Sequence, residues 1–221
     1  AAGYDVMGIG KVYHHEEDNT GQFGEGYFYE NHQAFGRGYV TEVSRELIER
    51  NSREREARGL GPEVPDNGRG PCTESGPEDE KMYPDGGIAA AVVAKLNVQK
   101  EKAKPFFLAV GWRKPHLPFV APQSYWDLYD TKQNFRPKND KMPIDMPRYT
   151  ANYNFAELRN YVDVPYEGPI PEELDQKLMR GYRACVSFMD AQVGKVLDAL
   201  EQNGQMENTV VVFMVDHGFS L

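Results

Sequence analysis

Two unbroken apolar runs constrain the fold of this chain most strongly. Residues 106–111 read Phe-Phe-Leu-Ala-Val-Gly, and residues 209–215 read Thr-Val-Val-Val-Phe-Met-Val. Each run has the length of a strand, and continuous apolarity without alternation is typical of a strand buried on both faces of a parallel sheet. We therefore predict that 106–110 and 210–215 are strands of one mostly parallel sheet.

A long amphipathic helix precedes the second run. Apolar side chains recur at intervals of three and four residues from Leu174 to Leu200, which is the spacing of one buried helix face. A proline opens the periodic segment and Gly204 follows it, so we predict a helix over 171–202. Helix and strand in alternation indicate an α/β fold, in which a mostly parallel sheet is flanked by helices.

The other elements are shorter. We expect a strand or turn over 4–9, a surface helix over 41–58 and a short helix over 122–130. A further helix, rich in Ala and Val, is expected from about Ile88 to Glu101, with Asp85 as its N-cap.

Two long connections interrupt this pattern. Residues 59–87 are rich in Gly, Pro and Asp, and residues 131–170 are rich in Pro and Tyr. We interpret both as loop insertions in one domain that spans 1–221, since long loops in compact domains usually serve function. The two cysteines make neither a disulfide framework nor a zinc site: Cys185 is expected in the core, whereas Cys72 is either free or paired outside this chain.

Charge excludes some classes of partner. The formal net charge is −9 and the pI is near 5.1, which disfavours general binding to nucleic acid. An anionic substrate would need a local basic pocket. No apolar stretch approaches the ~18 residues of a membrane span, and residues 1–5 lack a signal-peptide pattern.

Three of the five histidines stand at the ends of expected strands. They lie in Gly10-Lys11-Val12-Tyr13-His14, in Arg113-Lys114-Pro115-His116 and in Asp216-His217-Gly218. The carboxyl ends of parallel strands meet at one edge of a sheet. We therefore expect four side chains to share one crevice, namely those of Lys11, His14, His116 and Asp216.

This combination of side chains suits an anionic substrate beside a cation. A lysine supplies charge, imidazoles supply donors or acids, and Asp216 supplies a hard oxygen for a divalent metal. The alternative for Asp216 and His217 is a plain strand-to-loop turn with a solvated histidine.

Four segments, taken together and in order, resemble the sulfatase family, and within it the iduronate-2-sulfatase-like branch. Residues 3–14 are similar to its Lys/His segment, and Phe106 to Phe119 is similar to its FFLAVG-x-x-KPH-x-PF segment. Residues 184–194 and 212–218 are similar to the helix and strand that lead to its metal site. The resemblance implies an alkaline-phosphatase-like α/β fold, here incomplete.

The resemblance also implies the chemistry. The activity would be metal-dependent hydrolysis of a sulfate ester, with a sulfated carbohydrate as the expected substrate, by an exported enzyme (periplasmic, extracellular or lysosomal). Lys11, His14 and His116 would contact the sulfate ester or the leaving oxygen. Asp216 would bind calcium with His217 beside it. Lys114 would bind or position the substrate, and its alternative is a solvated loop lysine.

One part of the family pattern is missing. The family nucleophile is a formylglycine made from Cys or Ser in a Cys-x-Pro-x-Arg segment, and the residues after Cys72 and Cys185 do not fit it. The paired metal-binding Asp residues and the Lys that follows Asp-His-Gly are not found either. We therefore expect an internal fragment, inactive alone, of an enzyme that a formylglycine-generating enzyme matures.

Two other functions stay open. A phosphodiesterase or phosphonate hydrolase of the same superfamily needs similar donors and metals, and a Thr nucleophile in place of Cys or Ser would identify it. A non-catalytic member of the family would lack the nucleophile in its full-length gene.

Overall fold

The structure is a computed structural model, and it describes residues 3–13, 27–28, 37–60, 69–130, 144–145 and 157–215. Its elements, in chain order, are β1 (Asp5–Gly10), β2 (Tyr27–Phe28), α1 (Glu42–Ala57), β3 (Thr73–Gly76), η2 (Glu80–Met82), α2 (Pro84–Gln99), β4 (Phe106–Gly111), β5 (Phe119–Pro122), α3 (Gln123–Asp127), η4 (Leu158–Asn160), α4 (Glu172–Gln202) and η5 (Met206–Asn208).

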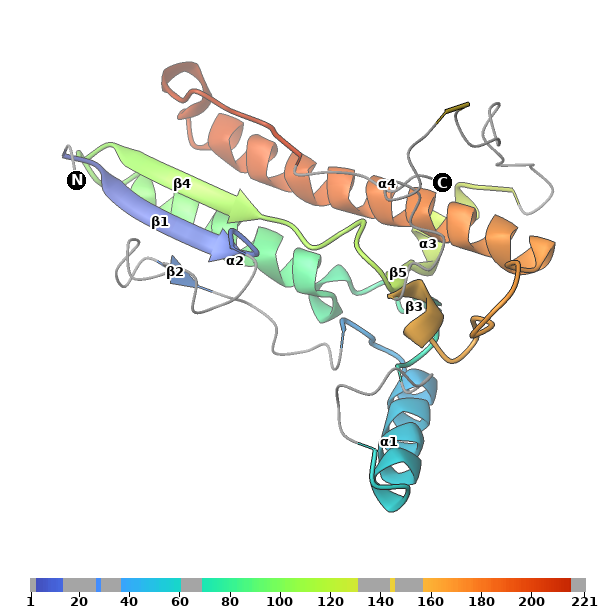
Figure 1. The fold of residues 1–221 in the computed structure, drawn as a ribbon. Helices are drawn as coiled ribbons and strands as arrows, with labels where there is room; N and C mark the ends of the chain where they lie inside the picture. Colours follow the sequence, from blue (N-terminus) through green and yellow to red (C-terminus); the bar gives the residue numbers. More distant parts are fainter. Residues whose placement is uncertain are drawn as a thin grey trace.

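All of the strand pairs between these elements are parallel. One sheet has the order β2-β1-β4, and a second sheet pairs β3 with β5. In the larger sheet Asp5 lies opposite Phe106 and Gly10 lies opposite Gly111. Figure 1 shows β1 and β4 side by side and pointing the same way. Both strands therefore end at the same edge, and the predicted α/β class is confirmed.

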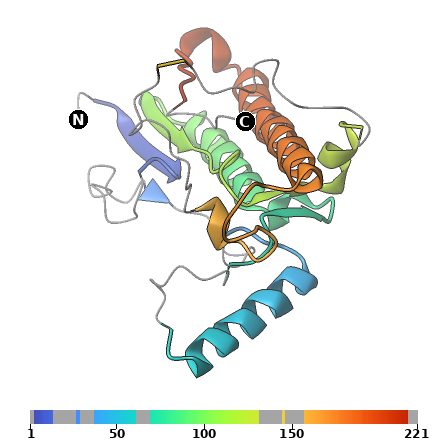
Figure 2. The same ribbon diagram turned by 45° about the vertical axis from the view of Figure 1, so that its right-hand side comes forward.

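Helix α2 packs between the larger sheet and α4, as the view in Figure 2 shows. The buried side chains of this layer come from β1, α2 and α4, and they are Ile9, Ile88, Val92, Leu96, Ala199 and Leu200. Small and β-branched residues on α2 let it approach both neighbours closely. This core fixes α2 beneath the strands that lead to the sheet edge.

A second core lies between β3, β5, α3 and α4. Phe119 and Trp126 are buried in it, and Tyr83 meets Phe188 edge to face, with 5.3 Å between ring centroids. The segment 112–118 joins β4 in the first core to β5 in the second. Both of its ends are therefore held by packed elements.

Several predicted elements are confirmed. The long helix begins after Pro171 and ends before Gly204, whose φ of +67° is the left-handed value that favours glycine. The surface helix α1 has Thr41 as N-cap, where the hydroxyl accepts a hydrogen bond from the Ser44 N–H. Cys185 is fully buried in the core, as expected.

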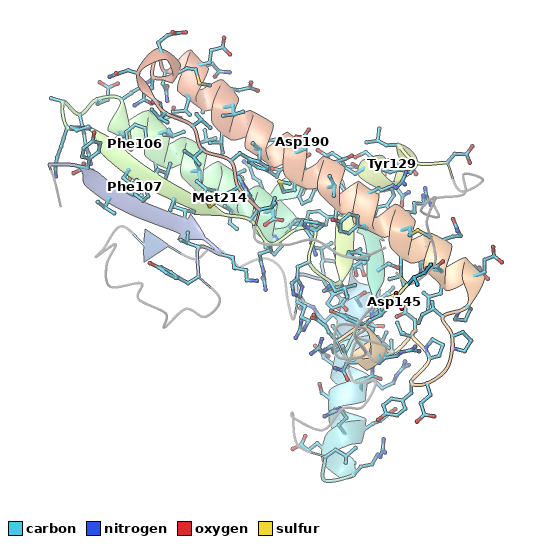
Figure 3. All side chains as sticks on the ribbon, turned by 45° about the horizontal axis from the view of Figure 1, so that its top comes forward. Phe106, Phe107, Tyr129, Asp145, Asp190 and Met214 are labelled. Atoms are coloured by element: carbon cyan, nitrogen blue, oxygen red, sulfur yellow. The ribbon has the colours of Figure 1, made fainter. Side chains whose placement is uncertain are left out.

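The prediction of a strand over 210–215 is wrong for this structure. The segment after η5 has no strand partner among the described residues, and its side chains are exposed, from 50% at Val211 to 90% at Val210. Met214, labelled in Figure 3, is 80% exposed. Apolarity predicts a tendency to be buried, but a strand also needs a hydrogen-bonded neighbour.

Strand β4 is buried on one face only. Phe106 packs against the α2–α4 core, whereas the next residue, Phe107, is 55% exposed (Figure 3). Successive strand side chains point to opposite faces, and the helices cover the Phe106 face. The expectation of burial on both faces, drawn from the continuous apolar run, is therefore wrong for the described part of the chain.

The expected loop 59–87 contains regular structure. Strand β3 forms from Thr-Glu-Ser-Gly, a sequence with no apolar run, because it pairs with β5. Helix α2 begins at Pro84, and its N-cap is Tyr83, so the prediction of Asp85 as N-cap is wrong. Residues 61–68 and most of 131–170 lie outside the described residues. No helix in the described part is long and apolar enough to cross a membrane.

Candidate active site

Two glycines bring the strand ends together at the edge of the larger sheet. Gly10 adopts a φ of +78°, and a Cβ built on it would lie 2.3 Å from the carbonyl oxygen of Gly111. A side chain would not fit there. The backbone N–H of Lys11 then donates to the same Gly111 oxygen at 2.8 Å. Lys11 therefore leaves β1 directly beside the start of the segment 112–118.

A carboxylate on α2 holds this segment by its backbone. One oxygen of Asp85 accepts a hydrogen bond from the N–H of Arg113 at 2.7 Å, and the other accepts from the N–H of Lys114 at 2.8 Å. Asp85 is 1% exposed. Burial raises the pKa of Asp85, and the two N–H donors and the Lys114 charge act in the opposite direction.

The side chain of Lys114 binds the backbone of the same segment. Its ammonium group donates to the carbonyl oxygens of Pro118 and His116, and the residue is 7% exposed. Burial lowers the pKa of Lys114, and the nearby Asp85 charge raises it. The alternative of a solvated loop lysine is wrong. Substrate contact by Lys114 stays a prediction.

His116 sits between backbone and solvent with a defined tautomer. Its Nδ1 lies 2.7 Å from the Leu117 carbonyl oxygen, and since a carbonyl only accepts, Nδ1 carries the proton. In the neutral ring Nε2 then carries no proton and is an acceptor. Burial lowers the pKa of His116, the Glu157 carboxylate raises it, and the Lys11 charge lowers it. Lys11 is thus one of the charges that act on the pKa of His116.

Glu157 connects this histidine to two arginines. One carboxylate oxygen lies 2.7 Å from Arg37 Nη1 and 3.2 Å from Arg69 Nη1, and the other lies 3.7 Å from His116 Nε2. Arg69 also lies over the Tyr161 ring, 5.5 Å from its centroid. Glu157 could not be identified from the sequence, because a single glutamate in a long connection is ordinary; only the fold brings it close to His116.

The other predicted site residues lie outside the described residues. His14, Asp216 and His217 are among them, and the convergence of the predicted site residues in one crevice stays a prediction. Within the described ranges no group of three or more His, Cys, Asp or Glu could hold a metal ion. A carboxylate and an imidazole suit a divalent cation chemically, but calcium takes 6–8 oxygen ligands, so further ligands would be needed.

The described cysteines are both buried. Cys72 donates its backbone N–H to Asp163 at 2.7 Å, and its sulfur lies 3.3 Å from the other oxygen of that carboxylate. Burial raises the pKa of the Cys72 thiol, and it raises that of Cys185 to about 12. Buried, protonated thiols are poor nucleophiles. Neither cysteine is a candidate for the nucleophile.

The whole sequence matches one known protein family. The sulfatase family model matches residues 1–221. This chain belongs to the sulfatase family. Its relatives include sulfatases of several kinds, so the resemblance seen in the motifs is confirmed across the chain.

Three of the similar proteins show the range of the match. Iduronate 2-sulfatase of Mus musculus is 36% identical over 149 residues, which is 64% of this sulfatase chain and 27% of the mouse protein. Arylsulfatase of Clostridium perfringens is 25% identical over 98% of this chain and 44% of its own length. The solved structure of Ps i-CgsB in complex with k-i-k-neocarrahexaose covers 90% of this chain and 34% of its own, with 15% identity and a TM-score of 0.43. The sulfatase chain thus spans less than half the length of each.

Proposed function

We propose that this chain forms part of the catalytic domain of a metal-dependent sulfatase that cleaves a sulfate ester of a sulfated carbohydrate. The observation that carries the proposal is that β1 and β4, the strands before Lys11 and before the His116 segment, are parallel neighbours that end together in a sulfatase-family chain. A lysine and a histidine that follow such strands are residue types that suit a tetrahedral anion. The similarity to iduronate 2-sulfatase supports a sugar as the substrate.

Each residue has a distinct role in this proposal. Lys11 binds the sulfate oxygens through its charge. His116, with Nδ1 bonded to the Leu117 carbonyl, presents Nε2 to the ester, where the protonated ring donates to the leaving oxygen or holds the sulfate. His14 shares this task. Lys114 acts through the backbone of the His116 segment, because its ammonium group already bonds to that backbone.

Asp216 and His217 would hold the metal ion, for which we propose calcium. When bound, such an ion stabilises negative charge on the sulfate oxygens. The protein residues that bind and orient the ester remain those of the Lys11 and His116 edge. Removal of the carboxylate by Asp216→Ala is expected to lower activity by orders of magnitude while the fold survives.

We further propose that the nucleophile, a formylglycine, lies in a part of the enzyme outside these 221 residues. Two observations support this. Both cysteines are buried in settings that keep the thiol protonated, and the match covers 27% of the mouse relative. A formylglycine-generating enzyme would then be a partner of the full-length protein, the chain alone would be inactive, and the enzyme would be exported.

The test is an assay of the full-length protein, co-expressed with a formylglycine-generating enzyme. Hydrolysis of an aryl sulfate and of sulfated sugars, lost on chelation of the metal, is the expected result. A phosphodiester is the comparison substrate. Faster phosphodiester cleavage without sulfatase activity would overturn the proposal in favour of a phosphodiesterase of the same superfamily. Binding without cleavage of any ester would indicate a non-catalytic family member.

A further inference from the structure

The segment that carries His116 has no regular secondary structure, yet its backbone is tied to helix α2. The consecutive backbone N–H groups of Arg113 and Lys114 both donate hydrogen bonds to the carboxylate of Asp85, with N···O distances of 2.7 and 2.8 Å. We propose that Asp85 is a positioning residue that sets the place of His116 at the sheet edge. The proposal rests on the proposed function, in which His116 contacts the ester.

The side chain at position 85 is well suited to this task. Two adjacent N–H groups that point the same way need two acceptor atoms, and a carboxylate offers both without a donor of its own. Asp85 stands in the first turn of α2, and α2 is fixed by the buried Ile88, Val92 and Leu96 of the same helix. The position of the carboxylate is therefore set by the core and not by the loop.

The connection from Asp85 to His116 is short. Asp85 accepts a hydrogen bond from the N–H of Arg113. The carbonyl oxygen of Arg113 in turn accepts a hydrogen bond from the N–H of His116 at 3.0 Å. From the other side, the Lys114 ammonium group donates to the His116 carbonyl at 3.3 Å. Two hydrogen bonds thus separate the carboxylate from the backbone of the histidine. A shift of the loop would move the imidazole with it.

A purely structural role for Asp85 is the competing explanation, and the chain offers a matched control. Glu74 on β3 is also buried, at 7% exposure, and its carboxylate likewise accepts from a backbone N–H, that of Val40 at 2.8 Å, and from the Thr41 hydroxyl at 2.6 Å. Both of these hydrogen bonds join it to the start of α1, and neither joins it to residues 112–118. Loss of Glu74 should cost stability without moving His116.

The experiment compares Asp85→Asn with Glu74→Gln in the full-length enzyme. Each variant keeps the size of the side chain but replaces one acceptor oxygen by an amide donor, so one protein donor loses its partner. Thermal unfolding, amide hydrogen exchange over 112–118, and kcat and KM for an aryl sulfate are measured. For Asp85→Asn we expect exchange in this segment to rise at least roughly tenfold and kcat to fall roughly 10- to 100-fold, with a smaller change in KM. Glu74→Gln should lower the melting temperature and leave both the exchange and kcat of the folded enzyme unchanged.

The outcomes separate the two proposals. Unchanged exchange over 112–118 in Asp85→Asn, or equal losses of kcat in both variants, would overturn the positioning role. If the wild-type enzyme cleaves no sulfate ester, the proposed function fails. The exchange measurement then still decides whether Asp85 sets the position of the His116 segment.

Discussion

Gly10 and Gly111 face each other at the last register position of β1 and β4, where a Cβ on Gly10 would lie 2.3 Å from the Gly111 carbonyl oxygen. The contact is with backbone, which has little room to move. The left-handed φ of +78° at Gly10 adds a second reason for glycine. The candidate site begins one residue later, at Lys11, so the close approach of the strands sets where that lysine emerges.

Substitution of Gly10 by Ala should destabilise the fold by more than the cost of its φ alone. A left-handed φ costs a non-glycine residue about 1–3 kcal/mol, and the backbone contact adds to it. Gly168→Ala is the control, since Gly168 has a φ of +80° with nothing within 4 Å of the added Cβ. Thermal unfolding should show a clearly larger loss for Gly10→Ala, at about 2–4 °C per kcal/mol for a chain of this size. Equal losses in the two variants would show that the close contact is not real.

The acid sensitivity of the fold should depend in part on Asp5. Hydrogen bonds from Lys104 and Lys102, at 2.6 and 3.2 Å, lower the pKa of Asp5 from 3.8 to about 2. Because the folded-state pKa is the lower one, the stabilisation is complete above about pH 4 and is lost as the pH falls towards 2.

Asp5→Asn should therefore flatten the loss of stability between pH 4 and pH 2, measured as the urea midpoint at each pH. Lys104→Gln removes the main cause of the shift and should give a smaller flattening, because the Lys102 ion pair remains. High salt should weaken the effect in the wild type, because the ion pairs are at the surface. A fall in the urea midpoint between pH 4 and pH 2 that is as steep in Asp5→Asn as in the wild type would contradict the ion-pair geometry.

The exposed run over 210–215 should promote self-association of the 221-residue chain. It has six apolar residues in a row, without a charge or proline, which is typical of aggregation-prone segments. Val212→Lys should reduce the association seen by light scattering and change the free energy of unfolding by less than about 0.5 kcal/mol. Val98→Lys, at a valine that is 58% exposed on α2, should leave association as it is. A large destabilisation by Val212→Lys would instead mean that the run is buried, as its sequence predicts.

Local pattern predicted the elements whose formation needs little help from the rest of the chain. The 31-residue α4 and strand β4 follow from periodicity and apolarity. The run over 210–215 has the same local signal, but its state depends on a neighbouring strand. The β3 strand shows the reverse case, since it has no apolar signal and forms by pairing with β5.

The candidate site also contains residues that the local sequence indicates and residues that only the tertiary structure brings in. Lys11 and His116 can be proposed from the sequence because each follows a predicted strand, and parallel strands end at one edge; their role in a site stays a prediction. The hydrogen bonds that Asp85 accepts could not be predicted, because an aspartate before a helical segment is usually interpreted as an N-cap, and its donors lie 28 and 29 residues away. Glu157 could not be found either, since only tertiary structure brings it to His116.

In the full-length enzyme, His116→Ala should lower turnover much more than stability. The imidazole is 39% exposed at the side chain, so its loss leaves a small cavity, whereas the proposed contact with the ester disappears. We expect kcat to fall by roughly 100-fold or more, as for loss of a general acid. His15→Ala, next to the motif position His14, is the control and should be nearly silent. Parallel losses of kcat and melting temperature in His116→Ala would remove His116 from the proposed site.

The carboxylate of Glu157 should set the protonation of His116. It lies 3.7 Å from Nε2 and raises the pKa of His116. Burial, the largest effect, and the charge of Lys11 both lower this pKa. Glu157→Gln removes the negative charge and also leaves Arg37 and Arg69 without that partner, and both changes disfavour the imidazolium. The pKa of His116, followed by NMR titration of the ring protons, should therefore shift further down, so that the neutral ring persists to lower pH. Glu207→Gln, a change of the same kind within η5 and far from this site in sequence, should leave the titration unchanged. An upward shift in Glu157→Gln would place the carboxylate elsewhere and leave the tautomer of His116 set by Leu117 alone.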